Sequence, residues 1–181
     1  MIKVLRTLLT ALLLLVVGGA STAVATHGQP ERELPIWGAV VGPDEEPDMA
    51  ATGCSAGGAD LLWRFTSSGY GQVSHLGRVE YDFTHCTRVD NSIREGVLTL
   101  TAANGDLLVL SYTGVIAPWG PESTSALWTM HWEVDYGTGQ FASAAGAGVA
   151  DAETFIPPLE SKTELSISGM ISYDASDRAS K

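Results

Sequence analysis

The sequence has 181 residues, of which 45% are hydrophobic and 17% are charged. This length predicts a single domain, and the apolar fraction is sufficient for a hydrophobic core, which excludes a wholly disordered chain. The formal net charge of -11 argues against binding to nucleic acid through phosphates and against docking on anionic lipid, because both need a basic surface.

The N-terminus has the three parts of a secretory signal peptide. Lys3 and Arg6 form a positively charged segment, residues 8–17 are predominantly apolar, and small residues follow up to Ala25 in an A-x-A pattern. The apolar run is shorter than the roughly 20 residues that span a bilayer, and no second hydrophobic span follows. We therefore predict a signal peptide over residues 1–25, an extended segment over 26–34, and secretion to an extracellular or periplasmic compartment.

The sequence holds two cysteines, Cys54 and Cys86. In an oxidising compartment an even pair is expected to form a disulfide bond. The alternative is a metal or catalytic site that uses His85 and Cys86. Adjacent residues rarely ligate one zinc ion together, and the C-x-x-C and H-x-x-x-H spacings are missing, so we predict the disulfide.

Short β-rich runs separated by Gly, Pro, Asn and Asp recur along the mature chain, whereas helical periodicity is nearly absent. Strict alternation at residues 78–84 places Val79, Tyr81 and Phe83 on one face. Asn104-Gly105 between two apolar runs predicts a hairpin with a type I′ turn. The eight predicted strands are residues 36–41, 61–66 with a continuation toward 75, 78–84, 96–101, 107–113, 126–135, 146–153 and 165–173.

Eight strands joined mostly by hairpins leave two exposed edges unless the sheet closes on itself. We predict an all-β fold, a small closed antiparallel eight-stranded β-barrel of the calycin-like kind over residues 35–173, followed by a polar tail over 174–181. An open β-sandwich is the competing architecture from pattern alone. The interior of an eight-stranded barrel is filled by side chains or holds one small ligand.

Four segments resemble a family of secreted bacterial β-barrel proteins of largely unknown function that are similar to allene oxide cyclases and plant dirigent proteins. One of them, from Gly137 to Gly146, resembles a G-G-T-G-x-F-x-x-A-x-G signature, with Tyr136 in place of the first glycine. The others are residues 71–78, 100–106 and 169–173. The resemblance covers about residues 35–173 and implies a barrel of the allene oxide cyclase type.

The motifs that carry this resemblance have a structural interpretation. Gly137 and Gly139 permit a turn with positive φ after a long strand, and Phe141 can then plug one end of the barrel. Gly77 indicates a bulge or a sharp bend, and His75 is expected to brace that bend. The motifs therefore predict how the barrel closes, but they do not indicate a chemical activity.

Motifs that would define a chemistry are missing. There is no nucleophile elbow, phosphate-binding loop, dinucleotide-binding glycine pattern, zinc spacing or calcium loop. The acidic run at residues 44–48 lacks the spacing of an EF-hand, so we interpret it as a solvated loop. We predict neither a metal site nor a cofactor.

The strand predicted at residues 126–135 carries polar side chains on one face and apolar ones on the other. His131 and Glu133 would form an acid–base pair, with Arg78 stabilising an anion, if the polar face lined the lumen. The apolar face is the better interior, so we expect these polar groups to face solvent. The predicted ligand contacts are Trp128, Met130 and Trp132, with Trp132 nearer to a small cavity at one mouth.

These observations favour a secreted, cofactor-free β-barrel that binds a small apolar or aromatic ligand or a partner surface. One alternative is an isomerase or cyclase that confines a reactive substrate in the barrel. Another is a structural or interaction protein whose barrel is fully packed. A lumen without room for a ligand would favour the last of these, and a roomy lumen with a buried charged pair would favour the enzyme.

Overall fold

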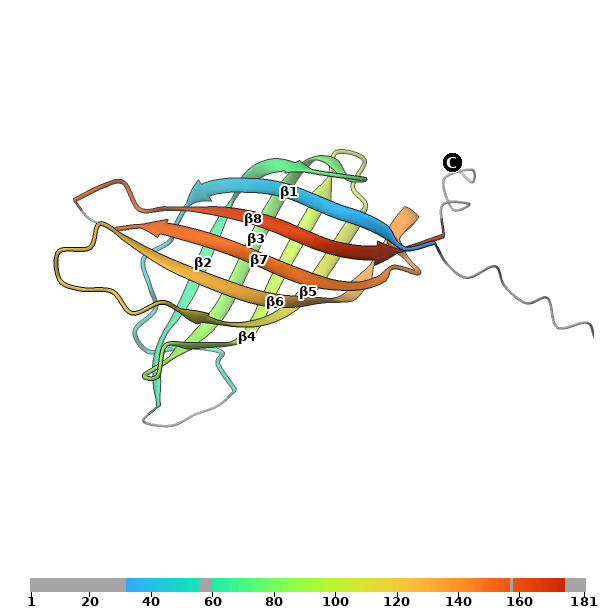
Figure 1. Cartoon of the computed structure of the whole chain (residues 1–181). Helices are drawn as coiled ribbons and strands as arrows, with labels where there is room; N and C mark the ends of the chain where they lie inside the picture. The colour runs from blue at the N-terminus through green and yellow to red at the C-terminus, as the bar shows by residue number, and fades with distance from the viewer. Residues whose placement is uncertain (1–31, 56–59, 157, 175–181) are drawn as a thin grey trace, which may run out of the picture.

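The computed structural model of the protein describes residues 32–55, 60–156 and 158–174 (Figure 1). The predicted signal peptide, most of the segment 26–34 and all but the first residue of the tail 174–181 lie outside the described residues. In the described part of the chain, no helix is long and apolar enough to cross a lipid bilayer.

Eight antiparallel strands follow one another in chain order, and β1 pairs with β8 along its whole length, which closes the sheet into a barrel. The predicted barrel is confirmed, and this pairing excludes the sandwich. All eight predicted strands are present and most are longer than expected. They are β1 (Leu34–Pro43), β2 (Leu61–Val73), β3 (Gly77–Arg88), β4 (Ser92–Ala102), β5 (Leu107–Ile116), β6 (Ser125–Gly137), β7 (Ala145–Phe155) and β8 (Lys162–Ser172), with the 3-10 turn η1 (Gly139–Phe141) between β6 and β7.

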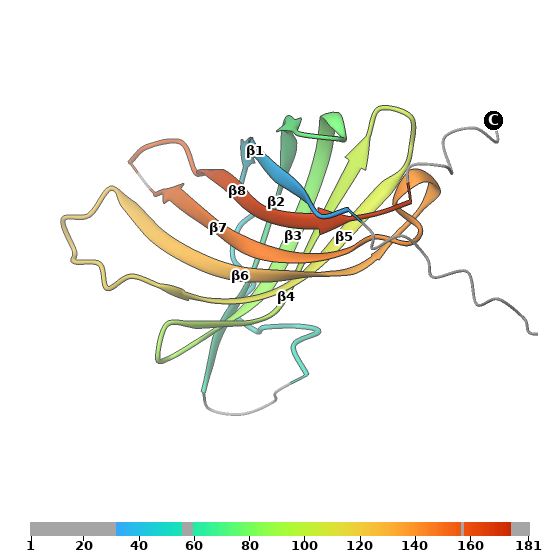
Figure 2. The same cartoon turned by 45° about the vertical axis from the view of Figure 1, so that its right-hand side comes forward.

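The two ends of the barrel differ. The odd-numbered strands end at what we call the open end, where the β5–β6 and β7–β8 loops extend beyond the sheet on the left of Figure 1. The opposite, closed end carries η1, and Figure 2 shows the curved strands β6 to β8 leading to it. Phe141 in η1 has no exposed surface and packs against the ring of Tyr173 at 5.1 Å between centroids. Phe141 therefore plugs the closed end, as its motif predicts.

Strand alternation decides which side chains fill the barrel. In β3, Val79, Tyr81 and Phe83 are each 1% exposed, whereas their neighbours Glu80 and Asp82 are exposed. Apolar side chains thus point inward at every second position, as period-two geometry requires. The predicted inner face of this strand is confirmed.

Two turns at the closed end differ in detail from the sequence prediction. Gly105 has φ +86°, but Asn104 is not in the left-handed region, so the hairpin is not a type I′ turn. Instead, Gly105 N donates to Ala102 O and Ala102 N to Asp106 O, the pattern of a type I turn followed by a left-handed glycine. One residue with positive φ is enough because the loop is one residue longer than a two-residue turn.

The turn after β6 contains two glycines, which are needed for different reasons. Gly139 has φ +54°, as predicted, but Gly137 has no positive φ. A side chain at Gly137 would overlap the backbone and Cβ of Phe141, so this glycine lets the plug approach the strand. Gly146, at the start of β7, likewise lies against the backbone of β8.

His75 and Gly77 form the sharp bend between β2 and β3. Both have positive φ, +68° and +74°. The His75 ring donates from Nε2 to Pro35 O at 2.9 Å and meets the ring of Tyr173 edge-on. The histidine therefore braces the bend against β1, as expected.

Gly139→Val is expected to destabilise the barrel more than His131→Ala. The left-handed backbone at Gly139 costs a β-branched residue about 1–3 kcal/mol, and a side chain there would overlap the buried carboxylate of Asp106. His131 is exposed on β6, where truncation should change the free energy of unfolding by about 0.5 kcal/mol or less. Denaturant midpoints of the two variants test the ranking, and a larger loss for His131→Ala would contradict it.

Cys54 and Cys86 form the predicted disulfide bond, with their Cα atoms 6.0 Å apart. The bond ties the β1–β2 loop to β3 across a sequence separation of 32 residues. Closing a loop of this length stabilises the fold by about 3–4 kcal/mol in the chain-entropy model. Because Cys86 directly follows His85, the bond also fixes the backbone at the open end.

Candidate functional site

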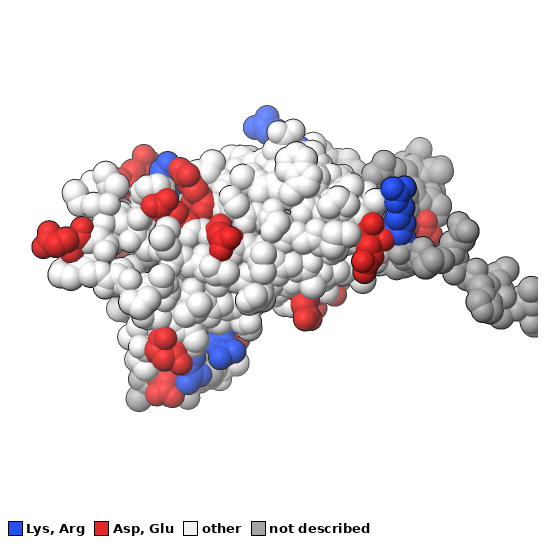
Figure 3. All heavy atoms as spheres, viewed as in Figure 1, with Lys and Arg blue, Asp and Glu red and all other residues white. Residues whose placement is uncertain are grey.

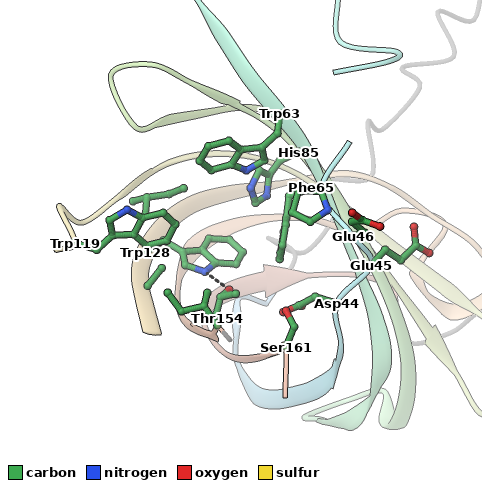
Figure 4. A pocket seen from close by; sticks show the side chains of 14 residues that line it. Asp44, Glu45, Glu46, Trp63, Phe65, His85, Trp119, Trp128, Thr154 and Ser161 are labelled. Atoms are coloured by element: carbon green, nitrogen blue, oxygen red, sulfur yellow. Dashed lines mark hydrogen bonds between the residues drawn. The ribbon is translucent and has the colours of Figure 1, made fainter. Parts of the chain in front are cut away.

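The open end of the barrel holds a cavity of about 410 Å³, which we call the open-end cavity (Figure 4). Ligand pockets typically measure about 300–1,000 Å³, so this volume accommodates one small molecule. The cavity is lined by the ends of strands and by three loops, those that follow β1, β5 and β7. Its lining residues are Asp44, Glu45, Glu46, Pro47, Trp63, Phe65, His85, Ile116, Trp119, Ala126, Trp128, Thr154, Ile156 and Ser161.

Four aromatic side chains give the cavity an apolar lining. Trp63 and Phe65 project inward from β2, Trp128 projects from β6, and Trp119 comes from the β5–β6 loop. Trp119 is 47% exposed, whereas Trp128 is 4% exposed, so the aromatic surface extends from the solvent into the barrel. Flat rings of this kind offer large contact areas to an apolar or aromatic ligand.

His85 lies in this aromatic lining, between Trp63 and Phe65 in Figure 4. Its ring centroid is 5.2 Å from that of Trp128 and 5.5 Å from that of Phe65. Burial lowers the pKa of His85 to about 3, because an imidazolium ion would lose its hydration there. The ring is therefore neutral at physiological pH.

The Tyr112 hydroxyl group is the hydrogen-bond partner of His85. The Tyr112 hydroxyl lies 3.3 Å from Thr84 O and 2.9 Å from His85 Nδ1. The Thr84 carbonyl oxygen can only accept, so when Tyr112 donates to it, His85 Nδ1 is the donor at the shorter contact. Burial raises the pKa of Tyr112 well above its usual value, so its proton stays in place. In this arrangement His85 Nε2 is an acceptor on a ring that lines the cavity.

Tyr112 reaches His85 because Gly96 leaves room for its ring. Gly96 in β4 pairs with Tyr112 in β5, and a side chain on Gly96 would overlap the tyrosine ring. A bulge between Ile93 and Gly96 accompanies this packing. The glycine thus acts on the cavity indirectly, through the orientation of the imidazole.

Asp44 brings a carboxyl group to the wall of the cavity just beyond the end of β1. Its Oδ2 accepts a hydrogen bond from Ser161 Oγ at 3.1 Å, whereas Oδ1 is buried without a hydrogen-bond partner. Burial raises the pKa of Asp44, and the hydroxyl groups of Thr163, Ser67 and Ser161 partly offset that effect. Part of the run 44–48 is therefore not a solvated loop, because Asp44 turns toward the barrel.

A chain of hydroxyl groups continues from the cavity into the wall. Trp128 Nε1 donates to Thr154 Oγ1 at 3.0 Å, and Thr154 Oγ1 lies 2.7 Å from Thr163 Oγ1. Since Thr154 accepts from the indole, its own proton is free to go to Thr163, whose hydroxyl group lowers the pKa of Asp44. The protons of this chain can thus point toward the Asp44 carboxyl group.

The residues predicted to contact a ligand occupy two different depths. Trp128 lines the open-end cavity, whereas Met130 and Trp132 are 0% and 1% exposed and lie outside its lining. Trp132 was expected to lie nearer to the cavity than Trp128, and the structure shows the reverse. The strand β6 runs from the open end inward, so Trp132 lies four residues deeper than Trp128. Trp132 is a core residue.

The three catalytic candidates do not lie in the cavity. His131 and Glu133 are exposed on the outer face of β6, and Arg78 is exposed on β3 with its guanidinium over the Tyr70 ring at 5.8 Å. The polar faces of both strands thus point to solvent, as expected from alternation. These residues have no geometry from which to act on a molecule in the lumen.

No family model, curated protein or solved structure matches this chain. Among the described residues, no group of three or more His, Cys, Asp and Glu side chains is placed to hold a metal ion.

Proposed function

We propose that this protein is a secreted carrier or receptor-like barrel that binds one small apolar or aromatic molecule in the open-end cavity. The observation that supports this function best is the aromatic-lined cavity of about 410 Å³ at one end of an otherwise packed barrel. Burial of apolar ligand surface would supply most of the affinity, at about 25 cal/mol per Å² removed from water. A hydrogen bond donated to His85 and the charge of Asp44 would orient the ligand.

The other two hypotheses are less well supported. A purely structural barrel needs no cavity of this size. An isomerase or cyclase needs a proton donor or acceptor facing its substrate. Asp44, whose partly buried carboxyl group has a raised pKa, could serve, as could His85 in the same cavity wall. We retain this enzyme as the second candidate, because a carboxyl group with a raised pKa is a common feature of catalytic sites.

Filling the cavity tests the proposal. Ala126 lines the cavity, so the ring of Ala126→Phe enters empty space. Titration of the native protein with Nile red, a neutral apolar dye, should give saturable binding with one site and an increase in dye fluorescence. We expect Ala126→Phe to weaken this binding by at least about tenfold.

Leu127→Phe is the matched control. Leu127 is the next residue in β6 and is 56% exposed on the outer face, so the same ring added there leaves the cavity open. Thermal unfolding of both variants checks that the barrel is intact. Equal binding by native protein and Ala126→Phe would place the dye elsewhere and contradict the proposed function.

A further inference from the structure

We infer that the open-end cavity selects an organic cation, a molecule with an apolar or aromatic body and one protonated amine. This inference rests on the proposed function and adds the chemical class of the ligand to it. Three independent features of the cavity support it: the charge of its wall, the acceptor on His85 and the arrangement of its aromatic rings.

The first feature is charge. Asp44, Glu45 and Glu46 all line the cavity, and no Lys or Arg among the described residues does. Lys162 lies at the same end of the barrel, but its Nζ is bonded to Glu164 Oε1 at 2.7 Å and sits over the Phe155 ring. Acidic side chains gather around the left-hand end in Figure 3, which is the open end. Together with the net charge of -11, this field attracts cations and repels carboxylates and phosphates.

The second feature is hydrogen bonding. His85 is 3% exposed and lines the cavity, and with its proton on Nδ1 its Nε2 can accept a hydrogen bond from a ligand. Its neutral ring does not repel a positive charge. The carboxyl group of Asp44 is partly buried in the cavity wall, and a nearby cation would compensate for the water that this group has lost. An ammonium group has three donors and no acceptor, so it can donate to His85 and be attracted by the charge of Asp44 in the same wall.

The third feature is the aromatic lining. Trp63, Trp119 and Trp128 line the same cavity as Phe65. The faces of indole rings attract cations within about 6 Å of the ring centroid, and the interaction strengthens when water is excluded. A neutral aromatic ligand would gain from the same rings by stacking alone. The combination of indole rings with carboxylates therefore favours a cation over a neutral molecule of the same shape.

Three probes of the same shape and different charge test this inference. They are 1-naphthylmethylamine, which is protonated at pH 7.5, the neutral alcohol 1-naphthalenemethanol and the anion 1-naphthoate. Isothermal titration calorimetry on the full mature protein should show the amine binding at least about tenfold more tightly than the alcohol. Naphthoate should bind more weakly than either.

Substitutions that remove acidic side chains test whether the cavity wall causes the preference for the amine. Asp44→Asn should weaken binding of the amine by at least about tenfold and leave binding of the alcohol unchanged. A unit charge a few ångströms away changes affinity from about fivefold in water to about a thousandfold in a partly buried site. The double variant Glu45→Gln/Glu46→Gln should also reduce the preference for the amine over the alcohol. It alters no buried contact, so it tests the inference even if Asp44→Asn fails to fold. Glu133→Gln, on the outer face of β6, is the control because it removes one negative charge away from the cavity.

The outcomes separate this inference from the proposed function. Equal affinity for the amine and the alcohol, or an amine preference that survives both sets of cavity substitutions, would overturn the organic-cation inference and leave the binding function standing. Binding of none of the three probes, together with a negative Nile red titration, would overturn both.

Discussion

Trp132→Ala is expected to lower the free energy of unfolding by about 3–5 kcal/mol, the range for truncating a buried tryptophan. Trp132 is 1% exposed, and its indole lies over Gly148 and Gly169, where any side chain would overlap its Cζ2 atom. The indole also donates from Nε1 to Val149 O at 3.1 Å. Since two glycines form the surface beneath the ring, no neighbouring side chain there can move in to fill the space left by alanine.

Trp128→Ala provides the comparison. Trp128 already borders the open-end cavity, so its truncation enlarges an existing space and removes fewer packing contacts. We expect a smaller loss of stability than for Trp132→Ala, together with weakened binding of Nile red, which Trp132→Ala should affect only through folding. Urea denaturation of both variants measures the two losses. If Trp128→Ala were the more destabilising change, the cavity would be filled in solution and the binding proposal would be contradicted.

The fold could be predicted from the sequence because the signals for its strands and turns are local and recur along the chain. Alternation in β3 around Tyr81 and turn residues such as Gly105 mark strands and hairpins independently of the rest of the chain. Closure then follows, because eight strands joined by hairpins have two edges to satisfy. The turn geometry at Asn104 and Gly137 was harder to predict, since it depends on loop length and on the approach of Phe141.

Part of the cavity was also visible in the sequence. The alternation of Val79, Tyr81 and Phe83 continues in phase to His85, which pairs with Phe65 on β2. Extending the predicted strand beyond Thr84 would have placed this histidine inside the barrel. The predicted strand, residues 78–84, stops one residue short of His85.

Other cavity residues carry no periodic signal. Trp119 and Asp44 lie in loops, and only the closure of the barrel brings them to the same mouth. The depth of Trp132 relative to Trp128 depends on which end of β6 is open, and that is set by the Phe141 plug at the other end. Strand alternation identifies the inner face of a barrel but not which part of that face is filled.

The pH dependence of stability should report directly on His85. In the unfolded chain a histidine takes up a proton near pH 6.5, whereas burial holds the pKa of folded His85 at about 3. Between these values the unfolded state binds more protons, so stability falls as the pH is lowered through this window. The slope is about 1.4 kcal/mol per pH unit, and the total is on the order of 4 kcal/mol across the window.

His85→Phe isolates this contribution. The phenyl ring fits among Phe65, Phe83 and Trp128, and Tyr112 keeps Thr84 O as its acceptor. Between pH 6.5 and pH 4.5 the native protein should lose about 2–3 kcal/mol more stability than the variant. The raised pKa of Asp44 acts in the opposite direction, stabilising the fold at low pH, but it is present in both proteins and cancels in the difference.

His131→Gln is the control, since it removes an imidazole from the exposed outer face of β6, away from the cavity. Urea denaturation at half-unit steps of pH gives the three profiles. If the free energy of unfolding changed with pH in the same way in the native protein and in His85→Phe, His85 would take up a proton in the folded state. That result would contradict a neutral His85 in the cavity wall. A steeper loss in the native protein alone would establish that the ring stays neutral, as the binding of a cation beside it requires.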